Sequence, residues 1–217
     1  MKKVFFLFIL LACVLVQAQQ IQTKKISLQE QTTHIELSAI GLDEIKIENS
    51  TSTTLEIVLL AENANGHAIA TQYQGTDLIV GFEPLFQSET AVFKKFITER
   101  LQRASVLVKV PKNRTVIVYG KTVDVISKSY QGAIAVYIDR GLVNLHNVQD
   151  NASISLHQGN IYANVSNSSI SVISNKGRIK VNDKIYLKSY KKEIPTANTL
   201  FKVSSIHANI TLQTNFK

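Results

Sequence analysis

The 217-residue sequence has little of what usually cross-links or interrupts a chain. It contains one cysteine, one methionine, no tryptophan, three prolines and nine glycines. Cys13 lies within an apolar N-terminal run, so a protein processed after that run would have neither disulfides nor thiolate chemistry. The scarcity of proline and glycine also argues against a disordered chain. Stability must therefore come from packing and hydrogen bonds.

Residues 1–18 are typical of a secretory signal peptide. A basic start, Met1-Lys2-Lys3, is followed by the apolar residues 4–16 and by Ala18, which predicts cleavage before Gln19. The apolar run is shorter than the roughly 20 residues that span a bilayer, and we predict no transmembrane segment in the mature chain. Leu10-Leu11-Ala12-Cys13 partly matches a lipobox, so a lipid anchor on Cys13 is the less favoured alternative. The sequence predicts export to the periplasm, the outer surface or the medium.

Acidic residues are few relative to basic ones. The chain has 24 Lys and Arg against 16 Asp and Glu, a formal net charge of +8. Such an excess can attract acidic polysaccharide or anionic headgroups, but a plain solvated surface is the favoured explanation. The densest basic groups, within 94–103 and 184–192, lack the interleaved aromatics of a single-strand-binding surface. We expect no nucleic-acid partner, and the partner stays open between an envelope polysaccharide and a surface protein.

Short alternating segments dominate residues 19–110, the predicted N-terminal β-rich part. Alternating apolar and polar residues predict half-buried strands at 34–37 and 44–48, and the apolar run 55–61 predicts a central strand. Segments 69–74 and 78–82 suit a hairpin closed by Gly75-Thr76-Asp77. Residues 84–104 break this pattern, and their apolar spacing suits either an amphipathic helix or a long loop.

Residues 111–217 carry an internal repeat. Gly141, Gly159 and Gly177 lie 18 residues apart, and each is followed by apolar residues two and four positions later. Two short strands per turn of 18 to 20 residues suit a solenoid, whose turns bury apolar side chains only by stacking. We predict an all-β fold with a right-handed parallel β-helix, continuous with the N-terminal part, in which the three glycines stack. An antiparallel meander is the alternative. Residues 208–212 suit a last turn, with Ala208 in the glycine position and 184–197 inserted before it.

The stretch from Ile45 onward resembles the adhesin-like β-helix domain family of unknown function, auto-transporter-adhesin-head-like, found in exported proteins of Bacteroidetes-type bacteria. The matching features are the strand ending in Val110-Pro111, the Gly-x-apolar-x-apolar segments, and Phe201–Ser205 leading to Ile210-Thr211-Leu212. The resemblance implies a β-helix in the cell envelope with an adhesin-like or ligand-display role. It supplies no catalytic or binding residues that can be transferred to this chain.

The residues show no catalytic constellation. The β-helix lyases and glycosidases cluster carboxylates, often with calcium, whereas Asp124, Asp139, Asp150 and Asp183 fall at different phases of the repeat. No Gly-x-Ser-x-Gly elbow is present, and the five histidines, including His146 and His157, lack metal-ligand spacing. We expect no enzyme, metal or cofactor. A carbohydrate-active enzyme or carbohydrate-binding protein on the same scaffold is the alternative.

The 18-residue period also predicts which outward side chains are neighbours. Leu142, Asn160 and Arg178 form one expected ladder, and Asn144, Tyr162 and Lys180 form the next. A flat β face with amides, a phenol and cations suits stacking and hydrogen bonding to sugars or an anionic polymer. The candidate ligand-facing residues are Asn144, Asn160, Tyr162, Arg178 and Lys180, and a plain solvated wall is the alternative.

Overall fold

The computed structural model describes residues 20–61, 67–84 and 104–215. The predicted signal peptide, its cleavage site, Cys13 and residues 85–103 of the predicted helix or loop lie outside these residues. Every regular element within them is a β-strand, and the strands join in one mixed, mostly parallel sheet, which confirms the all-β prediction. No helix in the described part of the chain has the length and apolarity of a membrane span.

The described residues form fourteen strands. The first seven are β1 (Gln20–Ser27), β2 (His34–Ser38), β3 (Glu44–Asn49), β4 (Thr54–Ala61), β5 (His67–Gln74), β6 (Asp77–Pro84) and β7 (Ala104–Val110). The other seven are β8 (Thr115–Thr122), β9 (Asp124–Lys128), β10 (Ile134–Val148), β11 (Ala152–Ser166), β12 (Ser169–Val181), β13 (Lys184–Lys192) and β14 (Leu200–Asn215).

Burial alternates along the N-terminal strands. Along β4 and β7 every second side chain is buried, because successive side chains of a strand point to opposite faces. The strands predicted at 34–37, 44–48 and 55–61 correspond to β2, β3 and β4. The predicted hairpin is also confirmed, since β5 pairs antiparallel with β6 around Gly75, whose φ is +63°.

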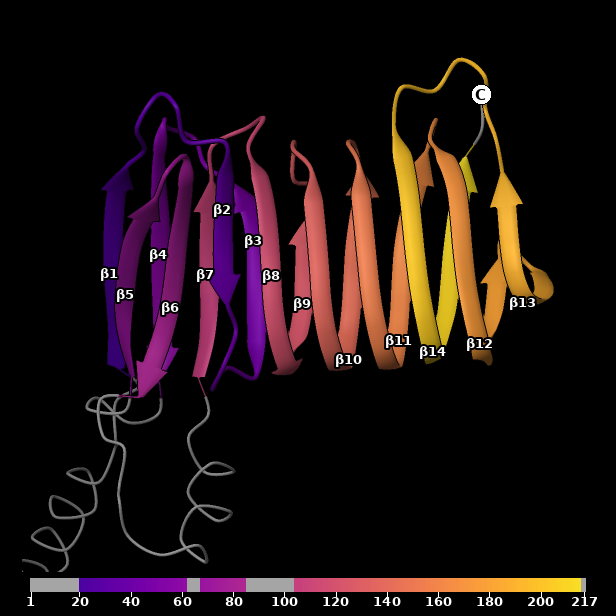
Figure 1. The fold of residues 1–217 in the computed structure, drawn as a ribbon, viewed down its shortest axis with the longest axis horizontal. Coiled ribbons are helices and arrows are strands. Elements are labelled where there is room, and N and C mark those ends of the chain that lie inside the picture. The colour runs from indigo at the N-terminus through magenta and orange to yellow at the C-terminus, as the bar shows by residue number, and fades with distance from the viewer. Residues whose placement is uncertain (1–19, 62–66, 85–103, 216–217) are drawn as a thin grey trace, which may run out of the picture.

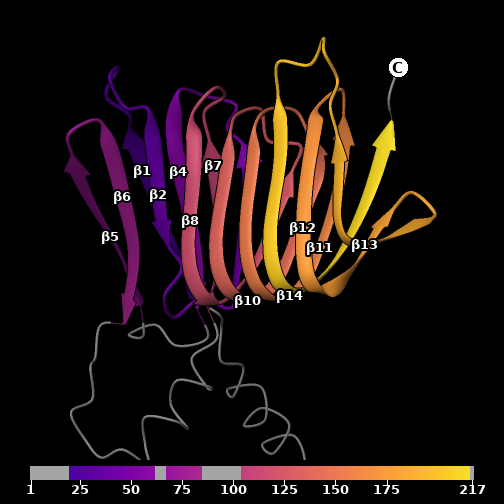
Figure 2. The same ribbon diagram turned by 45° about the vertical axis from the view of Figure 1, so that its right-hand side comes forward.

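The strands are arranged as two walls (Figures 1 and 2). The first wall, nearer the viewer in Figure 1, consists of β5, β6, β2 and β8, followed by the first segments of β10, β11, β14 and β12. The second wall consists of β1, β4, β7, β3 and β9, followed by the second segments of the same long strands. The long strands therefore cross from one wall to the other, and both walls share one axis of stacking.

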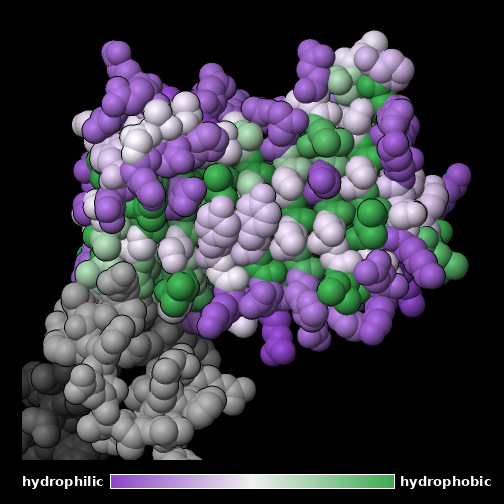
Figure 3. All heavy atoms as spheres, in the orientation of Figure 1, coloured by the Kyte–Doolittle hydropathy of each residue, from purple (hydrophilic) through white to green (hydrophobic). Residues whose placement is uncertain are grey.

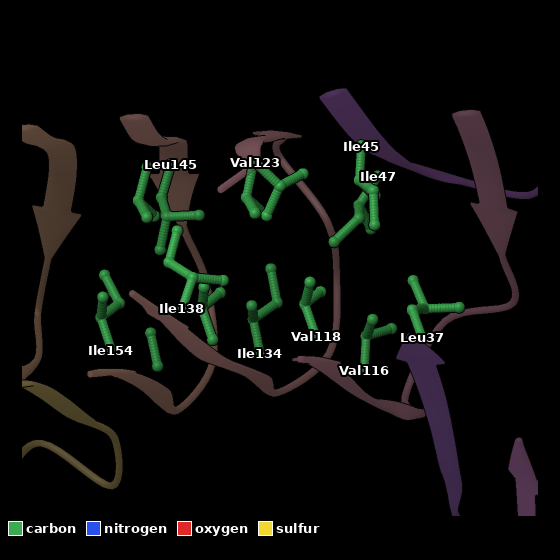
Figure 4. Packing of buried hydrophobic residues seen from close by; sticks show 14 of the residues in the cluster. Leu37, Ile45, Ile47, Val116, Val118, Val123, Ile134, Ile138, Leu145 and Ile154 are labelled. Atoms are coloured by element: carbon green, nitrogen blue, oxygen red, sulfur yellow. The ribbon is translucent and has the colours of Figure 1, made fainter. Parts of the chain in front are cut away.

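Apolar side chains fill the space between the walls. Figure 4 shows two rows pointing toward each other, with Leu37, Val116 and Ile134 in one row and Ile45, Val123 and Leu145 in the other. The buried residues form one continuous cluster from Ile35 to Leu212. Because each fully buried aliphatic side chain stabilises by about 1.5–3 kcal/mol, this shared core holds the two walls together.

The long strands keep the predicted 18-residue register at first. On β10 and β11, Gly141 pairs with Gly159 and Val143 with Ile161, so this part of the stacking prediction is confirmed. The prediction for Gly177 is wrong, because Ala208 of β14 takes the place beside Gly159. Gly177 lies one strand further along, on β12. A Cβ added at Gly177 would lie 1.8 Å from the Ala208 carbonyl oxygen.

The path of the chain after β12 explains this difference. β13 turns back and pairs antiparallel with β12, and β14 then enters between β11 and β12, parallel to both. Its buried side chains Phe201, Val203, Ile210 and Leu212 continue the core on either side. Residues 208–212 do form a repeat-like segment, as predicted, but they lie inside the stack and β13 is the last strand in the order.

Candidate functional site

Four of the five predicted ligand-facing residues line one shallow hollow on the second wall. We call it the ladder hollow, and its outward-facing lining is Asn160, Tyr162, Lys176, Arg178, Lys180, Ile185, Leu187, Asn209 and Thr211. The remaining predicted residue, Asn144, pairs with Tyr162 but does not line the hollow.

The strand order sets two rows across the ladder hollow. In the first row, Asn160 of β11 pairs with Asn209 of β14, whose side chain contacts β12 at Arg178. In the second row, Tyr162 pairs with Thr211, which pairs in turn with Lys180. The predicted direct contacts of Asn160 with Arg178 and of Tyr162 with Lys180 are therefore wrong, because β14 supplies an intervening residue in each row.

Hydrogen bonds orient the amides of the first row. The Arg178 backbone N–H donates to Asn209 Oδ1 at 3.1 Å, and Asn209 Nδ2 donates to Asn160 Oδ1 at 3.4 Å. Asp124 of β9 acts similarly toward β10, where its Oδ1 accepts from the Leu142 N–H at 2.8 Å. Side chains at this position of the repeat thus bridge neighbouring strands. The bond from Asn209 holds the Arg178 backbone in place beside the hollow.

Positive charge concentrates around the ladder hollow. Lys176, Arg178 and Lys180 line it, whereas no acidic or histidine side chain is in its lining. Asp183 approaches Lys180 at 3.4 Å from outside, but its side chain is 99% exposed, so this pair is weak. Residues 167–215 have eight Lys and Arg against two acids, whereas residues 20–61 have three against six. The field at this end of the molecule favours an anionic ligand.

Apolar surface borders the cations. Tyr162 is 45% exposed, and Ile185 and Leu187 on β13 are 61% and 88% exposed. Leu187 is aligned with Arg178 and Ile185 with Lys180 in the β12–β13 register. The ladder hollow can therefore offer charge and hydrogen bonds at its centre and apolar contact at two margins, which suits a ligand that has both kinds of surface.

The predicted histidines and aspartates occupy separate environments. The His157 ring lies beside His207, with centroids 5.6 Å apart, whereas His146 pairs with Lys128. Asp150 accepts from the Asn151 N–H at 2.6 Å. In the described ranges, no group of three or more His, Cys, Asp or Glu side chains is placed to hold a metal.

The sequence did not predict five of the nine residues in this lining, namely Lys176, Ile185, Leu187, Asn209 and Thr211. Asn209 and Thr211 follow Ala208 at the same phases as Asn160 and Tyr162 after Gly159, so the repeat held a signal for them. Ile185 and Leu187 could not be found that way, because 184–197 reads as an insertion. Ile185 and Leu187 lie two positions apart in a lysine-rich segment, and that spacing was the available signal for an edge strand.

Comparisons with solved structures support the fold. No family model matches the chain, and no curated relative is similar enough to be matched. A crystal structure from Clostridium sporogenes, provisionally described as a cell adhesion protein, aligns with a TM-score of 0.59 at 11% identity, covering 91% of this chain and 100% of that one. A provisionally described adhesin from Bacteroides fragilis aligns with a TM-score of 0.36 at 12% identity, covering 92% and 99%. The first alignment shows a shared fold.

Proposed function

We propose that this protein is an exported, non-enzymatic, adhesin-like component of the cell envelope that binds acidic glycan in the ladder hollow. The observation that carries the proposal is the convergence of Tyr162 from β11 with Arg178 and Lys180 from β12 in a hollow lined by no carboxylate. An acidic sugar offers anionic groups for the cations and a ring face for apolar contact. Guanidinium and carboxylate form charge-assisted hydrogen bonds of defined geometry.

The scaffold in this proposal is a right-handed parallel β-helix built from β2 to β14 and closed by antiparallel strands. Its support is the parallel pairing of the long strands and the 18-residue register of β10 on β11. Such a scaffold presents a rigid wall on which side chains from different strands keep fixed spacing. The shared fold with a provisionally described cell adhesion protein is consistent with display at a surface.

Export in this proposal depends on the signal-like residues 1–18. Expression of the full sequence in a Gram-negative host should yield a mature protein that begins at Gln19, measured by mass spectrometry of the intact chain. A mature protein that begins at a lipidated Cys13 would replace secretion with a lipid anchor. Retention of Met1 in the exported fraction would contradict both versions.

Binding of the mature protein to polygalacturonate tests the acidic-glycan proposal. Arg178→Gln with Lys180→Gln should weaken binding at least tenfold at constant ionic strength, because each charge-assisted hydrogen bond contributes about 1.5–3 kcal/mol. The matched control is Lys112→Gln with Lys121→Gln, which removes the same charge from exposed positions elsewhere. Equal weakening by both pairs would reduce the effect to net charge and would contradict a defined site. Release of new reducing ends would contradict the non-enzymatic part.

A further inference from the structure

The first wall carries a row of outward side chains that differs from the ladder hollow. In register, the row runs Ser38, Tyr119, Tyr137, Ser155, Ser204 and Ile173 across β2, β8, β10, β11, β14 and β12. The Tyr119 and Tyr137 rings stack with centroids 5.3 Å apart and planes 15° apart. Both remain more than 40% exposed. Two large aromatic side chains are therefore followed directly by two small hydroxyl side chains.

A second hollow lies beside this pair, where the serines leave space. We call it the tyrosine hollow, and its outward-facing lining is Tyr137, Asp139, Ser155, His157, Ser204 and Ile206. It belongs to the wall opposite the ladder hollow, and the two hollows have no lining residue in common.

The stacking geometry turns one face of Tyr137 toward the tyrosine hollow. The 5.3 Å separation of two nearly parallel rings is close to the strand spacing of about 4.8 Å, so both ring planes lie across the stacking direction. Tyr119 covers one face of Tyr137, and the other face looks over Ser155. The next large side chain of the row, Ile173, is three strands away, or about 14 Å. That gap accommodates a sugar ring in contact with the phenol.

The surroundings of the tyrosine hollow carry little charge. The neighbouring outward row runs Glu36, Ile117, Ala135, Ser153, Lys202 and Ser171, in which Glu36 on β2 and Lys202 on β14 are the charged members. Figure 3 shows this wall, with white and green atoms over its middle and purple atoms gathered along its margins. Asp139 and His157 at one margin add a carboxylate acceptor and an imidazole, which can donate and accept.

We propose that the tyrosine hollow binds uncharged pyranose units of a glycan. The apolar C–H face of one pyranose would stack on the free face of Tyr137, and its hydroxyls would hydrogen bond to Ser155, Ser204 and Asp139. A phenol ring combines a large apolar face with low conformational entropy, which suits this contact. The inference is independent of the acidic-glycan site, because it places a different ligand on the opposite wall.

Binding of cellohexaose, mannohexaose and chitohexaose, measured by saturation-transfer NMR and calorimetry on the mature protein, tests the inference. At least one probe should bind, Tyr137→Ala should weaken that binding at least tenfold, and Tyr137→Phe should retain it within about threefold because the ring remains. Ser204→Leu should also abolish binding by filling the hollow from an outward position. This variant keeps Tyr137 and thereby tests the site without loss of the ring.

The matched control is Tyr162→Ala, which removes a similarly exposed tyrosine from the opposite wall. It should leave neutral-sugar binding unchanged, as should Arg178→Gln with Lys180→Gln. Failure of all three probes to bind at millimolar concentration would overturn the inference. Equal effects of Tyr137→Ala and Tyr162→Ala would overturn it too. Since polygalacturonate binding is measured with the same variants, the failure of either proposal is distinguishable from the failure of the other.

Discussion

Gly159 shows how closely neighbouring strands approach at the corner between the walls. Its φ is +147°, and a Cβ there would lie 1.9 Å from the Gly141 carbonyl oxygen. Gly159→Ala should therefore destabilise the protein by about 3 kcal/mol or more, because both the backbone conformation and the contact become unfavourable. Urea unfolding followed by circular dichroism measures the loss.

The matched control for this change is Gly75→Ala. Gly75 also has positive φ, at +63°, but a Cβ there would meet nothing within 4 Å. Its substitution should cost about 1–2 kcal/mol, the cost of a left-handed conformation alone. If the two substitutions had the same effect, close approach of the Gly141 carbonyl would not be what requires glycine at 159.

Tyr130 is a buried phenol among carbonyl groups. Its Oη lies 2.7 Å from the Arg114 carbonyl oxygen and 3.1 Å from that of Pro111. Tyr130→Phe should cost about 1–3 kcal/mol, because these buried acceptors lose their donor and water cannot readily replace it. Chemical denaturation at pH 7 measures this cost.

Burial also raises the pKa of Tyr130 well above its ordinary value of 10.0. Above about pH 10 the Tyr130 phenol loses its proton in the unfolded chain but keeps it in the folded protein. Unfolding is therefore favoured as the pH rises. Stability should be level below about pH 10 and should fall at higher pH. Tyr130→Phe should make this alkaline fall shallower, as followed by melting temperature between pH 8 and 11.5. An unchanged slope would show that Tyr130 does not control it.

At the scale of elements, five strands of the second wall share an alternating row of charges. Lys25, Glu56, Lys109, Glu48 and Lys128 follow one another on β1, β4, β7, β3 and β9. The Lys109 ammonium lies 3.5 Å from Glu56, and the Lys128 ammonium lies 3.2 Å from Glu48. Opposite charges on adjacent strands favour this register over shifted ones.

Reversal of the central charge tests this row. Lys109→Glu places three carboxylates side by side and should destabilise the protein by about 1–2 kcal/mol at low salt, as measured by urea unfolding. Since the side chains are partly exposed, 1 M NaCl should remove most of the loss. Lys109→Gln is the control, with a smaller loss of about 0.5 kcal/mol. A loss that salt leaves unchanged would point to packing rather than charge.

Local pattern predicted most strands but not the order in which they pair. Period-two alternation identified β2 and β3, and the apolar run 55–61 identified β4. The spacing of Gly141 and Gly159 identified the pairing of β10 with β11. The place of β14 was not predictable, because Ala208-Asn209-Ile210 fits equally well beside β11, beside β12, or between them. Pairing between distant segments is decided by the competition of several compatible partners, and local sequence does not record the winner.

The same limit applies to the ladder hollow. Phase along each strand is local, so outward positions such as Tyr162, Arg178 and Lys180 were predictable. Neighbours across strands are not local, and Asn209 and Thr211 therefore separate the predicted pairs. Leu187 lies beside Arg178 because β13 turns back to pair antiparallel with β12. The repeat gives no sign of this turn. The structure thus brings four of the predicted side chains into one hollow, with Asn209 and Thr211 between them.

At the scale of the whole molecule, β14 raises a question about folding. Without it, β12 can pair directly on β11 in the 18-residue register, because Gly177 would follow Gly159 and Ile179 would follow Ile161. During synthesis β12 appears before β14, so this direct pairing is available first. We expect a chain stopped after Thr199 to adopt it, since the facing edges of β11 and β12 would otherwise both stay unpaired.

A disulfide between cysteines introduced by Tyr162→Cys and Lys180→Cys would report which pairing is present. In the full chain Thr211 lies between these positions, and two strand spacings of about 9.6 Å exceed the reach of a disulfide. In the chain stopped after Thr199, direct pairing brings the two Cα atoms to about 5 Å, so air oxidation should cross-link them. The protein is expressed in the cytoplasm without the N-terminal segment that contains Cys13, so the two introduced cysteines are the only ones present. The cross-link is detected as a mobility shift on non-reducing gels. An aggregated short chain without the cross-link would show that β11 and β12 cannot pair directly, and that β14 must enter before either strand is stable.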